Sequence, residues 1–154
     1  MAPPKGTVVV TGANGGLGSA IATRIAKSTE LAAHHGIYTV RNASSAPALQ
    51  AGLKHNATHP HDIVSLDLSS LTQVRETAAA INARVAAGEV PPIRALILNA
   101  GYQEMRDEQG FSVDGFDMTF ASNYLGHWLL VMLLLQSMDR DVGRIVVLGS
   151  MSHE

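Results

Sequence analysis

Cysteine is absent from the 154 residues, which excludes a disulfide framework and any metal site built on thiolates. Aromatic residues make up only 5% of the sequence and charged residues 16%, whereas hydrophobic residues make up 46%. A chain of that composition is too apolar and too weakly charged to be intrinsically disordered. The formal net charge of -2 gives no electrostatic reason to expect nucleic acid or an anionic membrane as a partner.

Long hydrophobic runs are also missing. The sequence enters an apolar strand pattern at once, without the hydrophobic region of a signal peptide. Its most apolar stretch, residues 128–135, covers about two turns of helix, far short of the roughly 20 residues that cross a bilayer. A buried helix accounts for this stretch better than a membrane-contacting surface does. We therefore expect a cytoplasmic protein with no membrane span.

Short β-branched runs alternate with helical patterns along the whole chain. The apolar runs predict strands at 7–11, 37–40, 63–66, 94–98 and 144–148. Helical spacing of apolar residues predicts helices from 17 onward, over 71–87 and over 116–138, with a shorter helix near 47–54. Strands of this type, separated by helices, indicate a parallel sheet with both faces covered and right-handed crossovers. The expected fold is α/β, a Rossmann-type doubly wound parallel sheet truncated after its fifth strand, with 1–154 as one dinucleotide-binding domain.

A glycine-rich turn, Thr11-Gly12-Ala13-Asn14-Gly15-Gly16-Leu17-Gly18, joins the first strand to the first helix. Such a turn lets the backbone approach a pyrophosphate, while the new helix directs free N–H groups and its positive dipole end at the anion. A glycine cluster alone can be a structural turn, but this one lies between a first strand and an amphipathic helix, which favours dinucleotide binding. Leu17, Ile21 and Ile25 are expected to pack that helix on the sheet, and Gly18 to allow close packing. The expected cofactor contacts here are Gly12, Asn14, Gly15, Gly16, Leu17 and Gly18.

The spacing T-G-x-x-x-G-x-G resembles the short-chain dehydrogenase/reductase family. The same residues also satisfy T-G-x-x-G-x-x-G, the pattern of the family's extended, sugar-nucleotide-modifying branch, so the loop alone does not separate the two. After the fourth strand, Asn99-Ala100-Gly101 resembles the Asn-Ala-Gly motif of the classical branch and disfavours the extended one. Small residues there would let the backbone lie under the cofactor, and Asn99 could join neighbouring strand ends.

The end of the second strand bears on the choice of nucleotide. NAD-specific Rossmann sites usually place a carboxylate there, but this chain has Arg41 and Asn42, and no Asp or Glu lies between Glu30 and Asp62. A guanidinium can pair with a 2′-phosphate, so NADP(H) is favoured over NAD(H), with Arg41 as the anchor and Asn42 as a donor. The alternative for Arg41 is a solvated surface side chain.

Asp67 and Leu68, at the end of the third strand, match the family's adenine-side motif. Asp67 could instead act as a helix cap or first-turn acid, a role that Ser69 or Ser70 could also fill.

The resemblance also implies catalytic residues. Asn123, within the long apolar helix and followed by Leu125-Gly126-His127, matches the family asparagine that holds a water in the proton relay and bends the helix. Ser150 matches the serine that hydrogen-bonds the substrate oxygen, with Ser152 as a less favoured candidate. We expect His127 to be structural, and the histidines of His59-Pro60-His61 to be solvated rather than metal ligands, so no metal is expected.

The family's Tyr-x-x-x-Lys, which supplies the general acid/base and its lysine, does not occur in these residues. We therefore expect an NADP(H)-dependent oxidoreductase acting on a small-molecule carbonyl or alcohol, with the 154-residue chain inactive alone. The alternative is a non-catalytic dinucleotide-binding module, a redox sensor or assembly subunit. An apolar fifth strand at the sheet edge, and a long helix without a covering neighbour, would favour homo-oligomers or aggregation.

Overall fold

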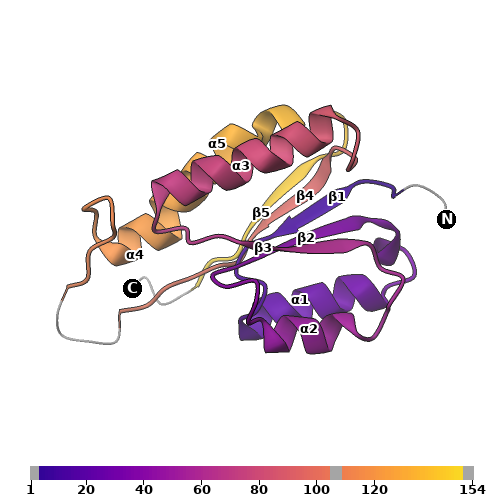
Figure 1. Cartoon of the computed structure of the whole chain (residues 1–154), viewed down its shortest axis with the longest axis horizontal. Helices are drawn as coiled ribbons and strands as arrows, with labels where there is room; N and C mark the ends of the chain where they lie inside the picture. Colours follow the sequence, from indigo (N-terminus) through magenta and orange to yellow (C-terminus); the bar gives the residue numbers. More distant parts are fainter. Residues whose placement is uncertain (1–3, 105–108, 151–154) are drawn as a thin grey trace.

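The computed structural model describes residues 4–104 and 109–150, which form one parallel sheet between two layers of helices (Figure 1). The sheet has the strand order β3-β2-β1-β4-β5. Its strands are β1 (Thr7–Val10), β2 (His35–Val40), β3 (His61–Ser65), β4 (Ile93–Leu98) and β5 (Arg144–Val147). The helices are α1 (Gly16–Lys27), α2 (Pro47–Leu53), α3 (Leu71–Ala86), α4 (Met118–Phe120) and α5 (Gly126–Leu134). The predicted α/β doubly wound fold is confirmed, and each predicted strand is present.

All four strand pairings are parallel, so the carboxyl ends of the strands meet at one edge of the sheet. The register pairs Val10 with Tyr38 of β2 and with Ile97 of β4. The chain winds outward from β1 through β2 to β3 and then crosses back to β4 on the other side of β1, so the winding direction reverses between β1 and β4. In sheets of this kind, ligands bind beyond the carboxyl ends at that switch point.

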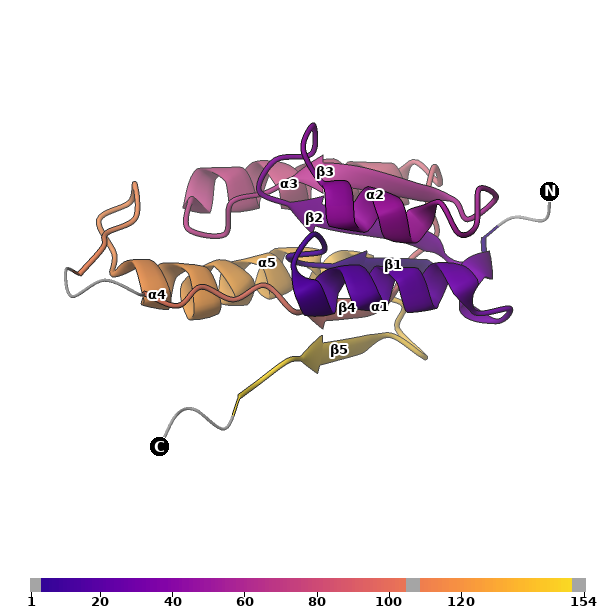
Figure 2. The ribbon, with the colours of Figure 1, turned by 90° about the horizontal axis from the view of Figure 1, so that it is seen from below.

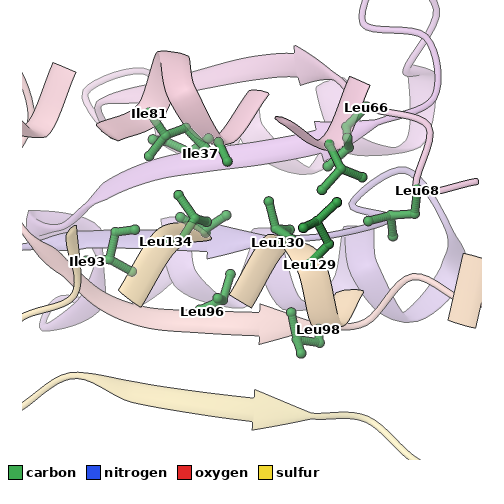
Figure 3. Packing of buried hydrophobic residues seen from close by; sticks show 13 residues of the cluster. Ile37, Leu66, Leu68, Ile81, Ile93, Leu96, Leu98, Leu129, Leu130 and Leu134 are labelled. Carbon is green, nitrogen blue, oxygen red and sulfur yellow. The ribbon is translucent and has the colours of Figure 1, made fainter. Parts of the chain in front are cut away.

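The alternation of side chains along each strand builds two separate cores. Val9 of β1 belongs to the core under α3 and α5. Figure 3 shows Leu96 of β4 and Leu130 of α5 in the same core. Val8 and Val10 point to the opposite face, into the core under α1 and α2. Because neighbouring residues of a strand face opposite sides, a nearly continuous apolar run fills both cores.

The first helix departs from its predicted packing face. Ile25 is buried and Ile21 is partly buried, but Leu17 is 70% exposed. Residues four apart are offset by about 40° around a helix, so a stripe with this spacing turns steadily away from the sheet. Leu17 as a core contact was therefore wrong.

The long predicted helix, 116–138, is a composite of several helical turns. Asp117 begins it, because its carboxylate accepts a hydrogen bond from the Phe120 N–H at 2.8 Å. A π-helical turn (Ala121–Leu125) joins α4 to α5, and a 3₁₀ turn (Leu135–Ser137) ends the run. Within the described residues this is one helical run, Met118–Ser137, with the length and mean hydropathy, 1.4, of a membrane span, and 33% of its apolar window is buried. A core helix meets the same criterion, and this run packs on α3.

The fifth strand forms an edge of the sheet that no described helix covers, as Figure 2 shows. All four residues of β5 are exposed, including Ile145, Val146 and Val147. On the neighbouring layer, α5 exposes Trp128 and Met132. The expected apolar edge and uncovered helix face are therefore present.

One expectation about the histidines was wrong. His59 is buried, and its Nε2 lies 2.8 Å from the Tyr38 hydroxyl, while its Nδ1 lies 3.2 Å from the Ala32 carbonyl oxygen. Tyr38 is fully buried in β2, and burial raises the pKa of its hydroxyl. The hydroxyl therefore needs a polar contact, and His59 supplies it, whereas His61 is exposed as expected.

Candidate functional site

A cleft of about 1040 Å³ lies across the carboxyl ends of the strands. That volume matches the upper end of small-molecule sites, which span roughly 300–1,000 Å³. Its walls come from the glycine-rich turn and from the segments that follow β2, β3 and β4. The cleft brings together all but two of the predicted site residues: Gly12, Asn14, Gly15, Gly16, Leu17, Gly18, Arg41, Asn42, Asp67, Leu68, Asn99, Ala100 and Gly101.

Two glycines of the turn are required by its geometry. Gly12 has a φ of +65°, a conformation that strains other residues, and a side chain there would lie 2.7 Å from the Ala100 Cα. A methyl group at Gly18 would overlap the Gly12 carbonyl oxygen and lie 2.7 Å from the Asn99 amide nitrogen. Gly18 therefore lets α1 start against the strand ends, as its predicted packing role requires.

The start of α1 opens directly into the cleft. The space over Gly16 is open. Gly15, the residue that precedes the helix, has no side chain, and no side-chain hydrogen bond caps the start of α1. The first N–H groups of a helix have no intrahelical acceptor, and here no acidic side chain lies in the first turn. The backbone thus presents free donors and a positive dipole end to an anion. Leu17 lies here too, so its exposure reflects its place on the cleft wall.

The Thr11 hydroxyl is the centre of a buried network beneath the cleft. Its Oγ1 accepts hydrogen bonds from the N–H groups of Asn99 and Ala100, both at 3.0 Å, and lies 2.9 Å from His127 Nε2. Because two donors already point at this oxygen, its own hydrogen is directed to His127. The Asn99 side chain donates to the Thr11 carbonyl at 2.8 Å and the Gly12 carbonyl at 3.2 Å, so Asn99 joins the two strand ends as predicted.

His127 extends this network into the helical run. With Nε2 as an acceptor, Nδ1 carries the proton and points to the Asn123 carbonyl oxygen, 3.3 Å away. Burial lowers the pKa of His127, and the hydrogen bond to the Asn123 carbonyl opposes that shift only in part. A neutral, structural imidazole fits these contacts.

Asn123 lies in the π-helical turn and is fixed by its side chain. Its Oδ1 accepts a hydrogen bond from the Tyr102 N–H and its Nδ2 donates to the Tyr102 carbonyl, both at 2.7 Å. Such turns are frequent at functional sites. Gly126 lets the following helix come close, because a side chain there would overlap the Leu68 carbonyl oxygen. Asn123 does not line the cleft, although Tyr102 does.

Ser150 is exposed and follows β5, two residues beyond Leu148, whose N–H donates to the Leu98 carbonyl at 3.0 Å. It lies at the carboxyl edge of the sheet but not among the residues that line the cleft. Ser152 lies outside the described residues.

The far wall of the cleft carries the residues expected at the nucleotide's ribose and adenine. Arg41 is exposed on this wall, and in the part of the chain that the structure describes it is the only cationic residue lining the cleft. Asn42 holds the local turn, because its Oδ1 accepts hydrogen bonds from the Ser44 N–H and hydroxyl.

Asp67 is the only lining carboxylate within the described ranges, and its Oδ1 accepts hydrogen bonds from the Ser69 N–H at 2.9 Å and hydroxyl at 2.7 Å. Ser70, not Asp67, caps α3, because the Gln73 N–H donates to the Ser70 hydroxyl. The helix-cap alternative for Asp67 was therefore wrong.

Asn14 has a function that sequence reasoning missed. Its Oδ1 accepts hydrogen bonds from the N–H groups of Ala48 and Leu49 at 3.1 and 3.2 Å, so it caps α2 from the glycine-rich turn. Met118 and Ser122 also line the cleft, although they were not predicted from the sequence. They are four residues apart and so share one face of the helical run, which is the signal that could have identified them.

The sequence is similar to those of known oxidoreductases. A family model described as short chain dehydrogenase matches residues 6–154. The short-chain dehydrogenase iccH of Talaromyces variabilis is 52% identical over 97% of this chain and 42% of its own length. Retinol dehydrogenase 13 of Homo sapiens is 35% identical over 97% of this chain and 43% of its own length. The chain thus spans less than half the length of these two relatives.

Solved structures agree on the architecture. A metagenomic short-chain oxidoreductase, crystallised in complex with NADP, superposes with a TM-score of 0.73 at 22% identity. The match covers 96% of this chain and 63% of that one, and at this identity it supports the fold alone. With the family model spanning nearly every residue, the chain belongs to the short-chain dehydrogenase family of oxidoreductases.

Proposed function

We propose that the protein is an NADP(H)-dependent oxidoreductase that transfers a hydride between the nicotinamide and a small carbonyl or alcohol substrate. One observation carries the choice of NADP(H). The open, uncapped start of α1 faces a cleft whose only lining cation among the described residues is Arg41, at the end of β2. The retinol dehydrogenase among the relatives, by its name, acts on an alcohol, which is consistent with this substrate class.

The residues of the cleft fit the parts of a dinucleotide. The free N–H groups at Gly16, Leu17 and Gly18 would hold the diphosphate, since the space over Gly16 is open. Arg41 would pair with the 2′-phosphate, with Asn42 beside it, and Asp67 and Leu68 would flank the adenine.

On the other side of Thr11, the small residues Asn99, Ala100 and Gly101 leave room for the nicotinamide half, because a side chain at Gly101 would meet open space. The bound cofactor supplies or accepts the hydride.

The catalytic assignments concern Ser150 and Asn123, which lie outside the residues that line the cleft. Ser150 would donate a hydrogen bond to the substrate oxygen, and Asn123, whose side chain is held by Tyr102, would hold a water of the proton relay. These 154 residues contain no Tyr-x-x-x-Lys, so the 154-residue polypeptide by itself should bind cofactor without turning over substrate.

The exposed apolar strand β5 is a candidate surface for self-association of the chain. Ile145 and Val147 of β5 are exposed along a strand that pairs only with β4 among the described strands. Edges and patches of this kind join other chains, so we propose homo-oligomers or aggregates for this polypeptide. The apolar helical run packs on α3 and contributes Leu129, Leu130 and Leu134 to the core, as a core helix does, and we propose a cytoplasmic location.

Titration of the protein with NADPH and NADH tests the cofactor assignment. The dissociation constant for NADPH should be lower, and Arg41→Ala should remove most of the difference by weakening NADPH alone, about tenfold for a lost charge-assisted contact. Arg75→Ala is the matched control, because Arg75 is exposed on α3 and does not line the cleft. Equal wild-type affinities for NADPH and NADH, or an unchanged ratio in Arg41→Ala, would overturn the proposal.

A further inference from the structure

We propose that Asn14 is a positioning residue for cofactor selection, which holds helix α2, and with it the Arg41–Ser45 segment, against the glycine-rich turn. The proposal builds on the NADP(H) function above and concerns how the 2′-phosphate subsite is built. Asn14 of the glycine-rich turn and Arg41, Asn42 and Ser45 of the segment after β2 all line the cleft.

The contact joins two elements that are far apart in the sequence. Asn14 Oδ1 accepts the N–H groups of Ala48 and Leu49 at 3.1 and 3.2 Å, across 34 and 35 residues. These are N–H groups of the first turn of α2, which would otherwise have no acceptor. The residue that precedes α2, Ala46, has no side chain able to cap it. The start of α2 is therefore capped from the cofactor turn rather than from its own sequence.

The segment between β2 and α2 depends on that anchor at its far end. At its near end it continues from β2, whose Thr39 carbonyl accepts the Ala13 N–H of the glycine-rich turn at 2.9 Å. In between, Ala43 N–H donates to the Ser65 hydroxyl at 3.0 Å. Ala46 and Leu49 are fully buried, so a shift at the start of α2 is transmitted to the short exposed loop that carries Arg41.

A rigid placement of Arg41 matters for one cofactor only. The 2′-phosphate of NADP(H) needs the guanidinium at a fixed place, whereas NAD(H) has only a hydroxyl there. If the segment samples other positions, the apparent affinity for NADP(H) falls by the fraction of time that the subsite is formed. A direct contact between Asn14 and the shared part of the dinucleotide would instead weaken NADPH and NADH equally.

The test combines cofactor titration with amide hydrogen exchange on Asn14→Ala in the full chain. We expect the dissociation constant for NADPH to rise about fivefold, as for loss of a helix cap, with that for NADH changing less than twofold. The amides of Ala48 and Leu49 should exchange faster. Asn14→Asp keeps an acceptor and should restore the slow exchange.

Asn56→Ala is the matched control. Asn56 Nδ2 donates to the Ala26 carbonyl at 2.9 Å, so it ties the chain just after α2 to α1, away from the cleft. It should lower stability and leave the ratio of NADPH to NADH affinity unchanged.

Three outcomes would overturn the proposal: unchanged affinities for both cofactors in Asn14→Ala, an equal loss for both cofactors, or a lost NADPH preference with unchanged exchange at Ala48 and Leu49. A wild-type preference for NADPH that needs Arg41 but survives Asn14→Ala refutes only this inference. Equal wild-type affinities for the two cofactors refute the NADP(H) function itself.

Discussion

Replacing Thr11 by valine removes one hydroxyl and almost no volume. Thr11 is fully buried, so the change leaves the Asn99 and Ala100 N–H groups and His127 Nε2 without the oxygen that now satisfies them. An unsatisfied buried polar group costs about 1–3 kcal/mol. Because Asn99 and Ala100 are only partly buried, water can reach some of these groups, and we expect about 1 kcal/mol for each of the three groups, about 3 kcal/mol in total. For a chain of this size that equals a fall in Tm of roughly 6–12 °C.

Thr11→Ser separates the hydroxyl from the packing. It keeps the oxygen and loses one buried methyl group, which costs about 1 kcal/mol. Urea unfolding followed by circular dichroism at low protein concentration gives the two free energies, and amide exchange at Asn99 and Ala100 reports the local effect. If Thr11→Val unfolds at the same urea concentration as Thr11→Ser, or if those two amides stay protected, the hydroxyl is not what joins β1 to β4.

Further predictions concern the cleft, the pH dependence of stability and the sheet edge. Gly18→Ala should abolish cofactor binding and destabilise the fold. Gly16→Ala, whose methyl group meets open space, should keep the fold and only weaken binding. Thermal melts measure the stability of the two variants, and NADPH titration measures their cofactor affinity. Burial lowers the pKa of His59 below its unfolded value of 6.5, so the unfolded chain takes up the proton first. Stability should be complete above pH 6.5 and fall below it, and His59→Gln should flatten that slope in unfolding measured from pH 7.5 to 5. Ile145→Lys with Val147→Lys should lower the mass seen by light scattering, and an unchanged mass would exclude β5 as the contact.

The fold could be predicted because its signals are local. Each β-branched run has the length and composition of a buried parallel strand, and the parallel order follows from the helices between the runs. The glycines were informative for the same reason, since Gly12 needs a positive φ and Gly18 a close approach that no other residue permits. Arg41 and Asn99 could be placed because both follow directly after strands, whose ends meet at one edge.

The remaining details depend on contacts between residues that are far apart in the sequence. His59 resembles a loop histidine until Tyr38, 21 residues earlier, is seen to need it as a hydrogen-bond acceptor or donor. Asn14 resembles one more residue of a glycine-rich turn until α2 is found to begin at its side chain. Leu17 was misplaced because a strict spacing of four rotates around a helix and does not stay on one face. The two pairings, His59 with Tyr38 and Asn14 with α2, leave no periodic pattern in the sequence.

The glycine-rich turn lies where the two cores of the fold meet, and its polar contacts reach into both. Thr11 connects it through His127 to the helical run on one face of the sheet, and Asn14 connects it to α2 on the other. A bound diphosphate would therefore order a turn to which both helix layers are already attached. Cofactor binding should therefore slow amide exchange at two distant places, at Ala48 on one face of the sheet and at Asn123 on the other. Thr11→Val should remove only the effect at Asn123, and Asn14→Ala only the effect at Ala48.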